Sequence, residues 1–288
     1  MKIAIVGAGG LVGSHLARYF ATEHQVLALT RHDLDITDHT AIKRWMRREQ
    51  PEVIINCSVL NVDECERDPA QAKAINVSGP RALAEAATEI EAEIIHFSTN
   101  YVFDGHRIGT PYTIEDETHP VNVYGQTKLD GEMAVREACP RNFILRTAWV
   151  FGHGKENFLS TVHRHLLAGE RLRAITDIWS STTFAADLAA RTSEILARRH
   201  YAVYHIVNAG SCSYHEFALE AARLAGVSET ETERLIEVVN EADLKRIAAR
   251  PRYTALRCLV SEQLGLPPMR DWRAALADYI RADRDLRG

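Results

Sequence analysis

Cysteine is scarce in this 288-residue sequence, and none of it is arranged for pairing. The five cysteines are odd in number and irregularly spaced, and they form no Cys-x-x-Cys motif. This pattern argues against a disulfide framework and against a zinc site built on cysteine. Free thiols are typical of a reducing compartment, so we expect a cytoplasmic protein.

Long apolar runs and a surplus of basic residues are also missing. No apolar run reaches the length of a membrane-spanning helix, which is about 20 residues. Met1 leads directly into a strand-like segment, so we expect no signal peptide. The 34 Lys and Arg residues are outnumbered by 39 Asp and Glu, which gives a net charge of −5 at pH 7. We therefore expect neither a membrane nor a nucleic acid as a partner.

The 13 histidines form no recognisable metal-binding motif. No His-Glu-x-x-His sequence occurs. His163 and His165 lie two positions apart on an expected helix, so their side chains would point in different directions. We therefore expect no metal ion in a catalytic centre.

What the sequence does contain is an alternation of short apolar runs with amphipathic stretches. The runs are rich in β-branched and aliphatic residues, as is typical of strands buried on both faces of a parallel sheet. We expect strands at 3–6, 25–29, 53–56, 94–98 and 143–146, and helices at 11–20, 40–49, 69–89 and 124–138. This order predicts an α/β fold with a Rossmann-type doubly wound parallel sheet.

The second half of the sequence is more mixed. Helical patterns at 158–168, 185–199, 213–224 and 271–284 are separated by strand-like segments at 173–176 and 204–207. We expect an NAD(P)-binding domain over 1–150 and a smaller mixed α/β substrate-binding lobe over 151–288. The chain is expected to cross back to the first domain around 173–205.

A glycine-rich turn follows the first expected strand and opens the first expected helix. In GAGGLVG, Gly7 permits the tight turn, Gly10 lets the backbone approach a pyrophosphate, and Gly13 allows close packing of the helix on the sheet. The helix N-terminus then presents free N–H groups to the phosphates. This arrangement predicts a dinucleotide site.

The residues after the second expected strand bear on the choice of dinucleotide. An acidic residue directly after this strand would bind both ribose hydroxyls and favour NAD(H), but the sequence has Thr30, Arg31 and His32 there. The guanidinium of Arg31 matches the geometry of a 2′-phosphate, while Asp33 slightly beyond could still serve the ribose. We predict NADP(H) in preference to NAD(H).

The segment VYGQTK carries the strongest catalytic pattern. Tyr124 and Lys128 are four residues apart, so they share one face of the expected helix. The tyrosine is suited to exchange a proton with a carbonyl oxygen as hydride is transferred, and the lysine to lower the phenol's pKa and hold ribose hydroxyls. Ser98 and Thr99 end the fourth expected strand, at the sheet edge where ligands bind in such folds.

These segments also resemble a known family. GAGGLVG, DITD, STNYVFDG, VYGQTKLDGE and LRTAWVFG, in this order and spacing, resemble the dTDP-4-dehydrorhamnose reductases among the extended short-chain dehydrogenases. The resemblance implies NAD(P)H-dependent reduction of a 4-keto nucleotide sugar in dTDP-rhamnose biosynthesis. It implies that Tyr124 is the proton donor, that Lys128 supports it and that Thr99 tunes it. The expected cofactor-binding residues are Gly7, Gly10, Leu11, Val12, Gly13, Arg31, Asp35, Ile36, Ser58, Val59, Tyr124 and Lys128.

The resemblance is weaker on the side that would face the substrate. The family usually has Asp where this chain has Asn100, and its Gln, Gly and Pro are missing from segment 177–183. The expected substrate-binding residues are Thr99, Asn100, Trp149, Trp179 and Arg250, with Phe158 also in the substrate lobe. The resemblance further implies a homodimer and Mg²⁺ at a subunit contact, although no carboxylate cluster identifies ligands for this ion.

Two alternatives remain open from the sequence. One is a nucleotide-sugar epimerase or dehydratase of the same fold, although a dehydratase usually has acidic residues after the threonine, where this chain has Asn100 and Tyr101. The other is a non-catalytic NADP-binding protein that resembles the regulatory subunit of methionine adenosyltransferase. The intact set of Thr99, Tyr124 and Lys128 favours an enzyme.

Overall fold

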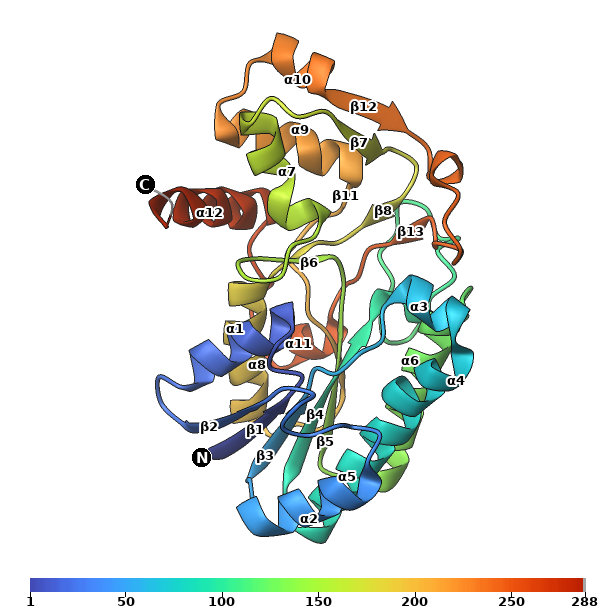
Figure 1. The fold of residues 1–288 in the computed structure, drawn as a ribbon, viewed down its shortest axis with the longest axis vertical. Coiled ribbons are helices and arrows are strands. Elements are labelled where there is room, and N and C mark those ends of the chain that lie inside the picture. Colours follow the sequence, from blue (N-terminus) through green and yellow to red (C-terminus); the bar gives the residue numbers. More distant parts are fainter. Residues whose placement is uncertain (287–288) are drawn as a thin grey trace.

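The computed structural model describes residues 1–286, which form a larger body around a parallel sheet and a smaller lobe beside it (Figure 1). The sheet has six strands in the order β10-β5-β4-β3-β1-β2, and all neighbouring strands run parallel. They are β1 (Lys2–Val6), β2 (Gln25–Leu29), β3 (Val53–Asn56), β4 (Glu93–Thr99), β5 (Asn142–Thr147) and β10 (Val203–His205). The predicted doubly wound sheet is confirmed.

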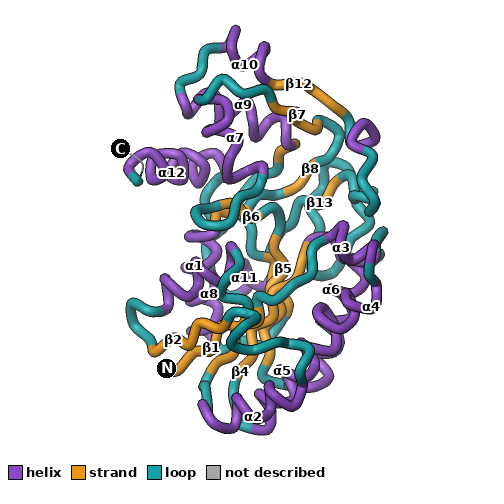
Figure 2. Tube along the Cα trace, viewed as in Figure 1, coloured by secondary structure: helices purple, strands orange, loops and turns teal. Residues whose placement is uncertain are grey.

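Helices cover both faces of this sheet (Figure 2). One face packs against α1 (Leu11–Phe20), α8 (Ala185–Arg198) and α11 (Leu259–Gln263), and the other against α2 (His39–Glu49), α5 (Gly79–Glu89) and α6 (Val123–Ala138). Successive residues of β1 alternate between the two faces. Ile3 and Ile5 join the first core, whereas Ala4 and Val6 join the second. Burial on both faces explains why the strands are almost continuously apolar.

The helix expected over 69–89 is present along its whole length, but a π-helical turn lies inside it. After α3 (Val62–Arg67) and α4 (Pro69–Lys73), a π-helical turn η1 (Ala74–Ser78) precedes α5. Pro80 has no N–H and so leaves the carbonyl of Asn76 without its usual helical donor. That carbonyl faces α6, where a Cβ at Gly131 would lie 2.1 Å from it. The π-helical turn therefore lets η1 approach α6 closely beside β4.

The smaller lobe is built from short strands and helices. Its strands are β6 (Val150–Phe151), β7 (Leu172–Ile175), β8 (Trp179–Ser180), β9 (Thr183–Phe184), β11 (Cys212–Ser213), β12 (Ile236–Val239) and β13 (Tyr253–Thr254). Its helices are α7 (Phe158–Leu167), α9 (Tyr214–Ala225), α10 (Glu229–Leu235) and α12 (Trp272–Asp285). Phe151, Phe217, Trp272 and Tyr279 are buried at its centre. The lobe therefore has a core of its own.

Parts of the C-terminal half lie on the larger body. Helix α8 packs against α1, and β10 forms the edge of the six-stranded sheet beside β5. Helix α11 packs in turn against β10. Of the expected return segment 173–205, residues 185–205 lie on the large sheet, whereas β7 pairs with β12 in the lobe. Hydrogen bonds from Thr147 at the end of β5 to Thr183 in β9, and from Asn100 after β4 to β8 and β13, hold the lobe at the carboxyl edge of the large sheet.

Candidate active site

A pocket of about 350 Å³ lies at the carboxyl ends of β1, β2 and β3. Seven of the predicted cofactor-binding residues line it: Gly7, Gly10, Arg31, Asp35, Ile36, Ser58 and Val59. Leu11 and Val12 form the start of α1 directly after its N-cap, Gly10. These seven residues come from separate segments of sequence and lie around one cavity, whereas Leu11, Val12, Gly13, Tyr124 and Lys128 are not among its lining residues.

The glycine turn has the shape that a dinucleotide requires. Gly7 has a φ of +84°, and a Cβ on it would lie 2.8 Å from the backbone nitrogen of Ser58. A Cβ on Gly13 would lie 2.4 Å from the carbonyl oxygen of Gly7. Gly13 thus allows α1 to pack on the turn itself, whereas we expected contact with the sheet. The N-cap residue of α1 is Gly10, which has no side chain to bond the first N–H groups of the helix. These N–H groups are therefore free to bind a phosphate.

In the segment after β2, the side chains of Asp33 and Asp35 are held by local hydrogen bonds. Asp33 accepts bonds from Thr30 N and Oγ1 at 2.8 and 2.7 Å, and Asp35 accepts bonds from Thr37 N and Oγ1 at 2.9 and 2.7 Å. These bonds lower the pKa of both carboxyls. Arg31 lies 3.4 Å from Asp35, and its side chain is 73% exposed. Its guanidinium is therefore accessible at the rim of the pocket.

The predicted catalytic residues meet at the carboxyl end of β4. A second pocket, of about 240 Å³, is lined by Thr99, Asn100, Tyr124 and Trp149 among others. Tyr124 lies in the first turn of α6, in the same pocket as Thr99. Burial raises the pKa of Tyr124 to about 12, and the neighbouring Thr99 hydroxyl opposes this rise. The phenol therefore carries its proton at neutral pH.

Lys128 lies one turn further along α6 and points into the protein. Its Nζ donates a hydrogen bond of 2.6 Å to the carbonyl oxygen of Phe97 and lies 3.4 Å from Nε2 of His96. Burial lowers the pKa of Lys128 to about 8, and the negative charge of Glu132 opposes this. In this structure burial, Thr99, Tyr101 and Cys65 act on the pKa of Tyr124. The influence of Lys128 on that pKa stays a prediction.

A buried ionic network holds the helix that carries Tyr124 and Lys128. Glu132 forms a bidentate ion pair with Arg146, with distances of 2.7 and 2.9 Å, and accepts a hydrogen bond from Ser98. Both charged side chains are less than a tenth exposed. The pair joins α6 to β5 and so fixes the helix that carries Tyr124 and Lys128.

The predicted substrate-binding residues are only partly brought together. Trp149 and Asn100 line the pocket of Tyr124. Trp149 has a φ of +37°, and its ring lies 3.9 Å from that of Tyr214, against which Phe158 packs edge-on.

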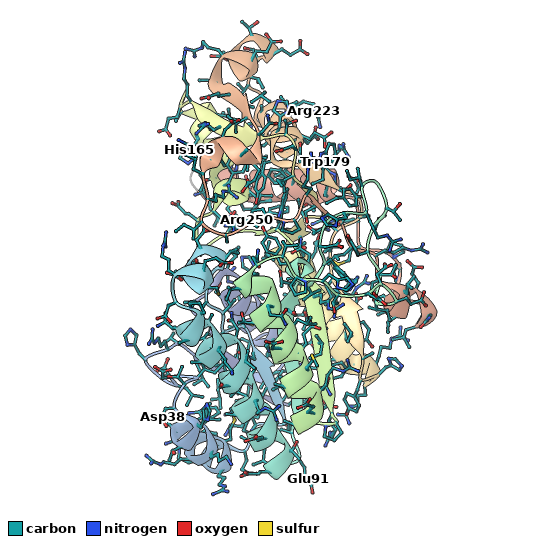
Figure 3. All side chains as sticks on the ribbon, turned by 90° about the vertical axis from the view of Figure 1, so that its right-hand side faces the viewer. Asp38, Glu91, His165, Trp179, Arg223 and Arg250 are labelled. Atoms are coloured by element: carbon teal, nitrogen blue, oxygen red, sulfur yellow. The ribbon has the colours of Figure 1, made fainter. Side chains whose placement is uncertain are left out.

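Trp179 and Arg250 are not among the residues that line this pocket. Trp179 lies in β8 within the lobe, and Arg250 lies near the level where the lobe meets the larger body (Figure 3). The guanidinium of Arg250 forms an ion pair of 2.9 Å with Asp63 of α3. Arg250 therefore joins the lobe to the larger body.

Several residues at these pockets were missed from the sequence. Tyr101 packs edge-on against Tyr124 with ring centres 5.7 Å apart, and it also lines the catalytic pocket. Its place directly after STN could have indicated this. Lys155 lines the dinucleotide pocket from the loop after β6, 80 positions beyond Ile75, the lining residue that precedes it in the chain. Nothing local in the sequence distinguishes it from a surface lysine.

Neither a metal cluster nor a membrane-spanning helix occurs among residues 1–286. No group of three or more His, Cys, Asp or Glu side chains in this part of the chain is placed to hold a metal ion. None of its helices has both the length and the apolar character that crossing a bilayer requires. All five cysteines are free thiols.

The chain is similar to known proteins both in sequence and in overall structure. Residues 1–284 match the family described as the RmlD substrate binding domain. The chain is 39% identical over 285 residues to a dTDP-4-dehydrorhamnose reductase of Mycolicibacterium smegmatis, covering 98% of this chain and 85% of that protein. A crystal structure of a dTDP-4-dehydrorhamnose reductase from Clostridium acetobutylicum superposes with a TM-score of 0.91 at 33% identity, over 99% of this chain and all of that one. A reductase of the same name from Bacillus anthracis, solved in complex with NADP, also has a TM-score of 0.91, at 29% identity, over 98% of this chain and 99% of that one.

Proposed function

The chain belongs to the dTDP-4-dehydrorhamnose reductase family, and from this premise we propose that it reduces the 4-keto group of a dTDP-linked sugar. It is an NAD(P)-dependent oxidoreductase of the extended short-chain type. One observation carries the proposal for the site: Thr99 and Tyr124 line one pocket at the same sheet edge as the glycine-lined dinucleotide pocket.

The side chains at this edge suit the protonation step of a ketone reduction. When bound, the nicotinamide supplies the hydride that the carbonyl carbon accepts. Thr99 and Tyr124 hold the carbonyl oxygen, and Tyr124 donates its phenolic proton to that oxygen. Because the pKa of Tyr124 is raised to about 12, the proton is present at neutral pH. The ammonium of Lys128, one helical turn away, favours the tyrosinate that remains after the transfer.

The residues after β2 support NADP(H) in preference to NAD(H). Thr30 follows β2 directly, in the place where an acidic residue would bind both ribose hydroxyls of an NAD(H) site, and Asp33 Oδ2 is turned to the backbone N–H and hydroxyl of Thr30. Arg31 offers an exposed guanidinium at the same rim, and a guanidinium binds a phosphate through paired hydrogen bonds. Lys155 adds a second cation to the pocket lining.

The nucleotide part of the substrate is assigned to the cleft between the lobe and the larger body. Trp149, whose ring is tilted against that of Tyr214, offers an aromatic surface at the catalytic pocket. Phe158 packs edge-on against Tyr214. From the family resemblance we assign Arg250 and Trp179 to the diphosphate side of the substrate. Because Arg250 is buried in an ion pair with Asp63, it serves that side by holding the lobe against the larger body.

Three further properties remain predictions. A cytoplasmic location is predicted from the unpaired cysteines, and the family resemblance implies a homodimer and Mg²⁺ at the contact between subunits. Sedimentation of the purified chain with Mg²⁺ and with EDTA tests the last two together.

The decisive experiment compares Tyr124→Phe with Tyr101→Phe. Oxidation of NADPH and of NADH is followed with 4-keto sugars linked to dTDP, UDP and GDP. Tyr124→Phe is expected to lower kcat at least about 100-fold while NADPH still binds, because only the proton donor is removed. Tyr101→Phe keeps the packing against Tyr124 and is expected to retain most of the activity.

Two results would contradict the proposal. Turnover of no keto sugar by the wild-type chain, together with tight NADPH binding, would favour the regulatory alternative. Full activity in Tyr124→Phe would remove the assigned proton donor.

A further inference from the structure

Asn100 connects the catalytic strand to the smaller lobe. It follows Thr99 directly at the end of β4 and is only 2% exposed. Its Nδ2 donates hydrogen bonds of 3.0 Å to Ser180 Oγ in β8 and 2.6 Å to Thr254 Oγ1 in β13. These partners lie 80 and 154 positions further along the chain. The amide therefore crosses from the larger body into the lobe.

The two lobe hydroxyls determine which end of this amide faces them. Ser180 and Thr254 are register partners in adjacent parallel strands. Thr254 Oγ1 donates to Ser180 Oγ at 3.3 Å, and Ser180 Oγ donates to the carbonyl oxygen of Thr254 at 3.4 Å. Since each hydroxyl already uses its proton, both offer lone pairs to a donor. The NH₂ end of Asn100 meets this requirement, and its oxygen is turned back towards Thr99.

That oxygen sets the direction of the Thr99 hydroxyl. Thr99 Oγ1 donates to Asn100 Oδ1 at 3.2 Å and accepts the backbone N–H of Tyr101 at 3.2 Å. Thr99 and Tyr124 line the same pocket. The bonds to Asn100 and to the Tyr101 N–H therefore fix the position of Thr99 Oγ1 beside the phenol. A carboxylate could not match both ends, because it accepts at each oxygen and would force both lobe hydroxyls to turn.

We propose that Asn100 is a positioning residue that makes the orientation of the catalytic Thr99 hydroxyl depend on the docking of β8 and β13. This inference rests on the proposed function, in which Thr99 and Tyr124 hold the carbonyl oxygen. The amide side chain acts through Thr99, so it sets the geometry of the reacting pair. Docking of the lobe is thereby linked to the rate of the chemical step.

The test removes one lobe hydroxyl without changing its volume. Thr254→Val keeps the shape of the side chain but leaves Nδ2 of Asn100 with one acceptor fewer, whereas Thr254→Ser keeps the hydroxyl. We expect Thr254→Val to lower kcat about tenfold with KM for NADPH unchanged, and Thr254→Ser to retain activity. Thr192→Val is the matched control, because it removes a buried hydroxyl that bonds only to the preceding turn of α8.

A second variant shows whether the effect passes through Asn100. Asn100→Ala is expected to lower kcat by a similar factor, and the double variant Asn100→Ala/Thr254→Val by no more than Asn100→Ala alone. The inference is wrong if the losses of kcat in the two single variants multiply in the double variant. It is also wrong if Thr254→Val leaves kcat unchanged. The wild-type assay separates the two claims. A wild-type chain without turnover defeats the proposed function and this inference together, whereas wild-type turnover with an active Thr254→Val defeats the inference alone.

Discussion

The two sides of the active-site cleft are held together in different ways. The dinucleotide side consists mainly of backbone: Gly7 and Gly13 let one turn touch the next, and most lining residues lie within the first 60 positions. The substrate side consists of side chains from distant segments, such as Asn100 with Ser180 and Thr254. At Gly7 and Gly13 the first side leaves no room for a Cβ. The second side depends on side-chain hydrogen bonds between the larger body and the lobe.

The buried cations of the two sides show the same contrast. Lys128 faces β4, is 2% exposed, and donates to a carbonyl oxygen. Arg250 in the lobe has a side chain 7% exposed and is neutralised by the carboxylate of Asp63. The lysine therefore retains an electrostatic penalty for its burial, while the arginine serves to connect two parts of the molecule.

The largest effect should come from adding one carbon to the backbone-built side. In Gly13→Ala the new Cβ would lie 2.4 Å from Gly7 O and 2.8 Å from Ala8 Cα, and neither backbone atom can rotate away. We expect a loss of about 3 kcal/mol in the free energy of unfolding and a loss of NADPH affinity. Denaturant unfolding and fluorescence titration with NADPH measure these two effects.

Gly9→Ala is the matched control for the stability measurement. Its Cβ would meet Thr30 Cγ2 at 3.7 Å, which is an ordinary contact. Equal unfolding free energies for the two variants would show that the close approach of α1 to the turn is not needed. The contrast between a backbone-built and a side-chain-built side of the cleft would then fail.

The next effect concerns the pH dependence of stability and arises from Lys128. The unfolded lysine titrates near 10.5, whereas burial lowers its pKa to about 8 in the folded chain. Between these values the unfolded state binds more protons, so the free energy of unfolding rises with pH, by up to about 1.4 kcal/mol per unit. The useful window is pH 8 to 9, because above it the buried thiols of Cys57 and Cys212, whose pKa values are raised, begin to oppose the rise.

Lys128→Met isolates this contribution. We expect the difference in unfolding free energy between the wild type and this variant to change with pH across the window. A difference that stays constant from pH 7 to 9 would show that Lys128 titrates normally in the folded chain.

The contrast between the two sides also explains how much of the fold and of the site could be predicted from the sequence alone. The doubly wound sheet and the pocket around Gly7 follow from local patterns, because parallel strands place the residues after them at one edge. The π-helical turn near Asn76 was missed because it depends on Pro80 together with the contact to α6. Lys155 and the partners of Asn100 were missed for a related reason. Their positions are set by contacts between segments that are distant in the sequence. The residues next to them in the sequence do not indicate these contacts.

The smallest effect is expected at the ion pair between the lobe and the larger body. Asp63 accepts hydrogen bonds from Arg250 at 2.9 Å and from the backbone nitrogen of Ala248 at 3.3 Å. Asp63→Asn removes the charge but keeps the size. Because the carboxylate is 34% exposed, we expect a loss of roughly 1 kcal/mol in the free energy of unfolding, with NADPH affinity unchanged.

Glu137→Gln provides the comparison for this last variant. It breaks the ion pair between Glu137 and Arg81, in which both side chains are largely exposed, and should change stability by less than about 0.5 kcal/mol. Denaturant unfolding of the two variants side by side measures the difference. If Asp63→Asn were as mild as Glu137→Gln, Arg250 would not need a carboxylate partner. Docking of the lobe would then depend on neutral contacts, such as those of Asn100 with Ser180 and Thr254.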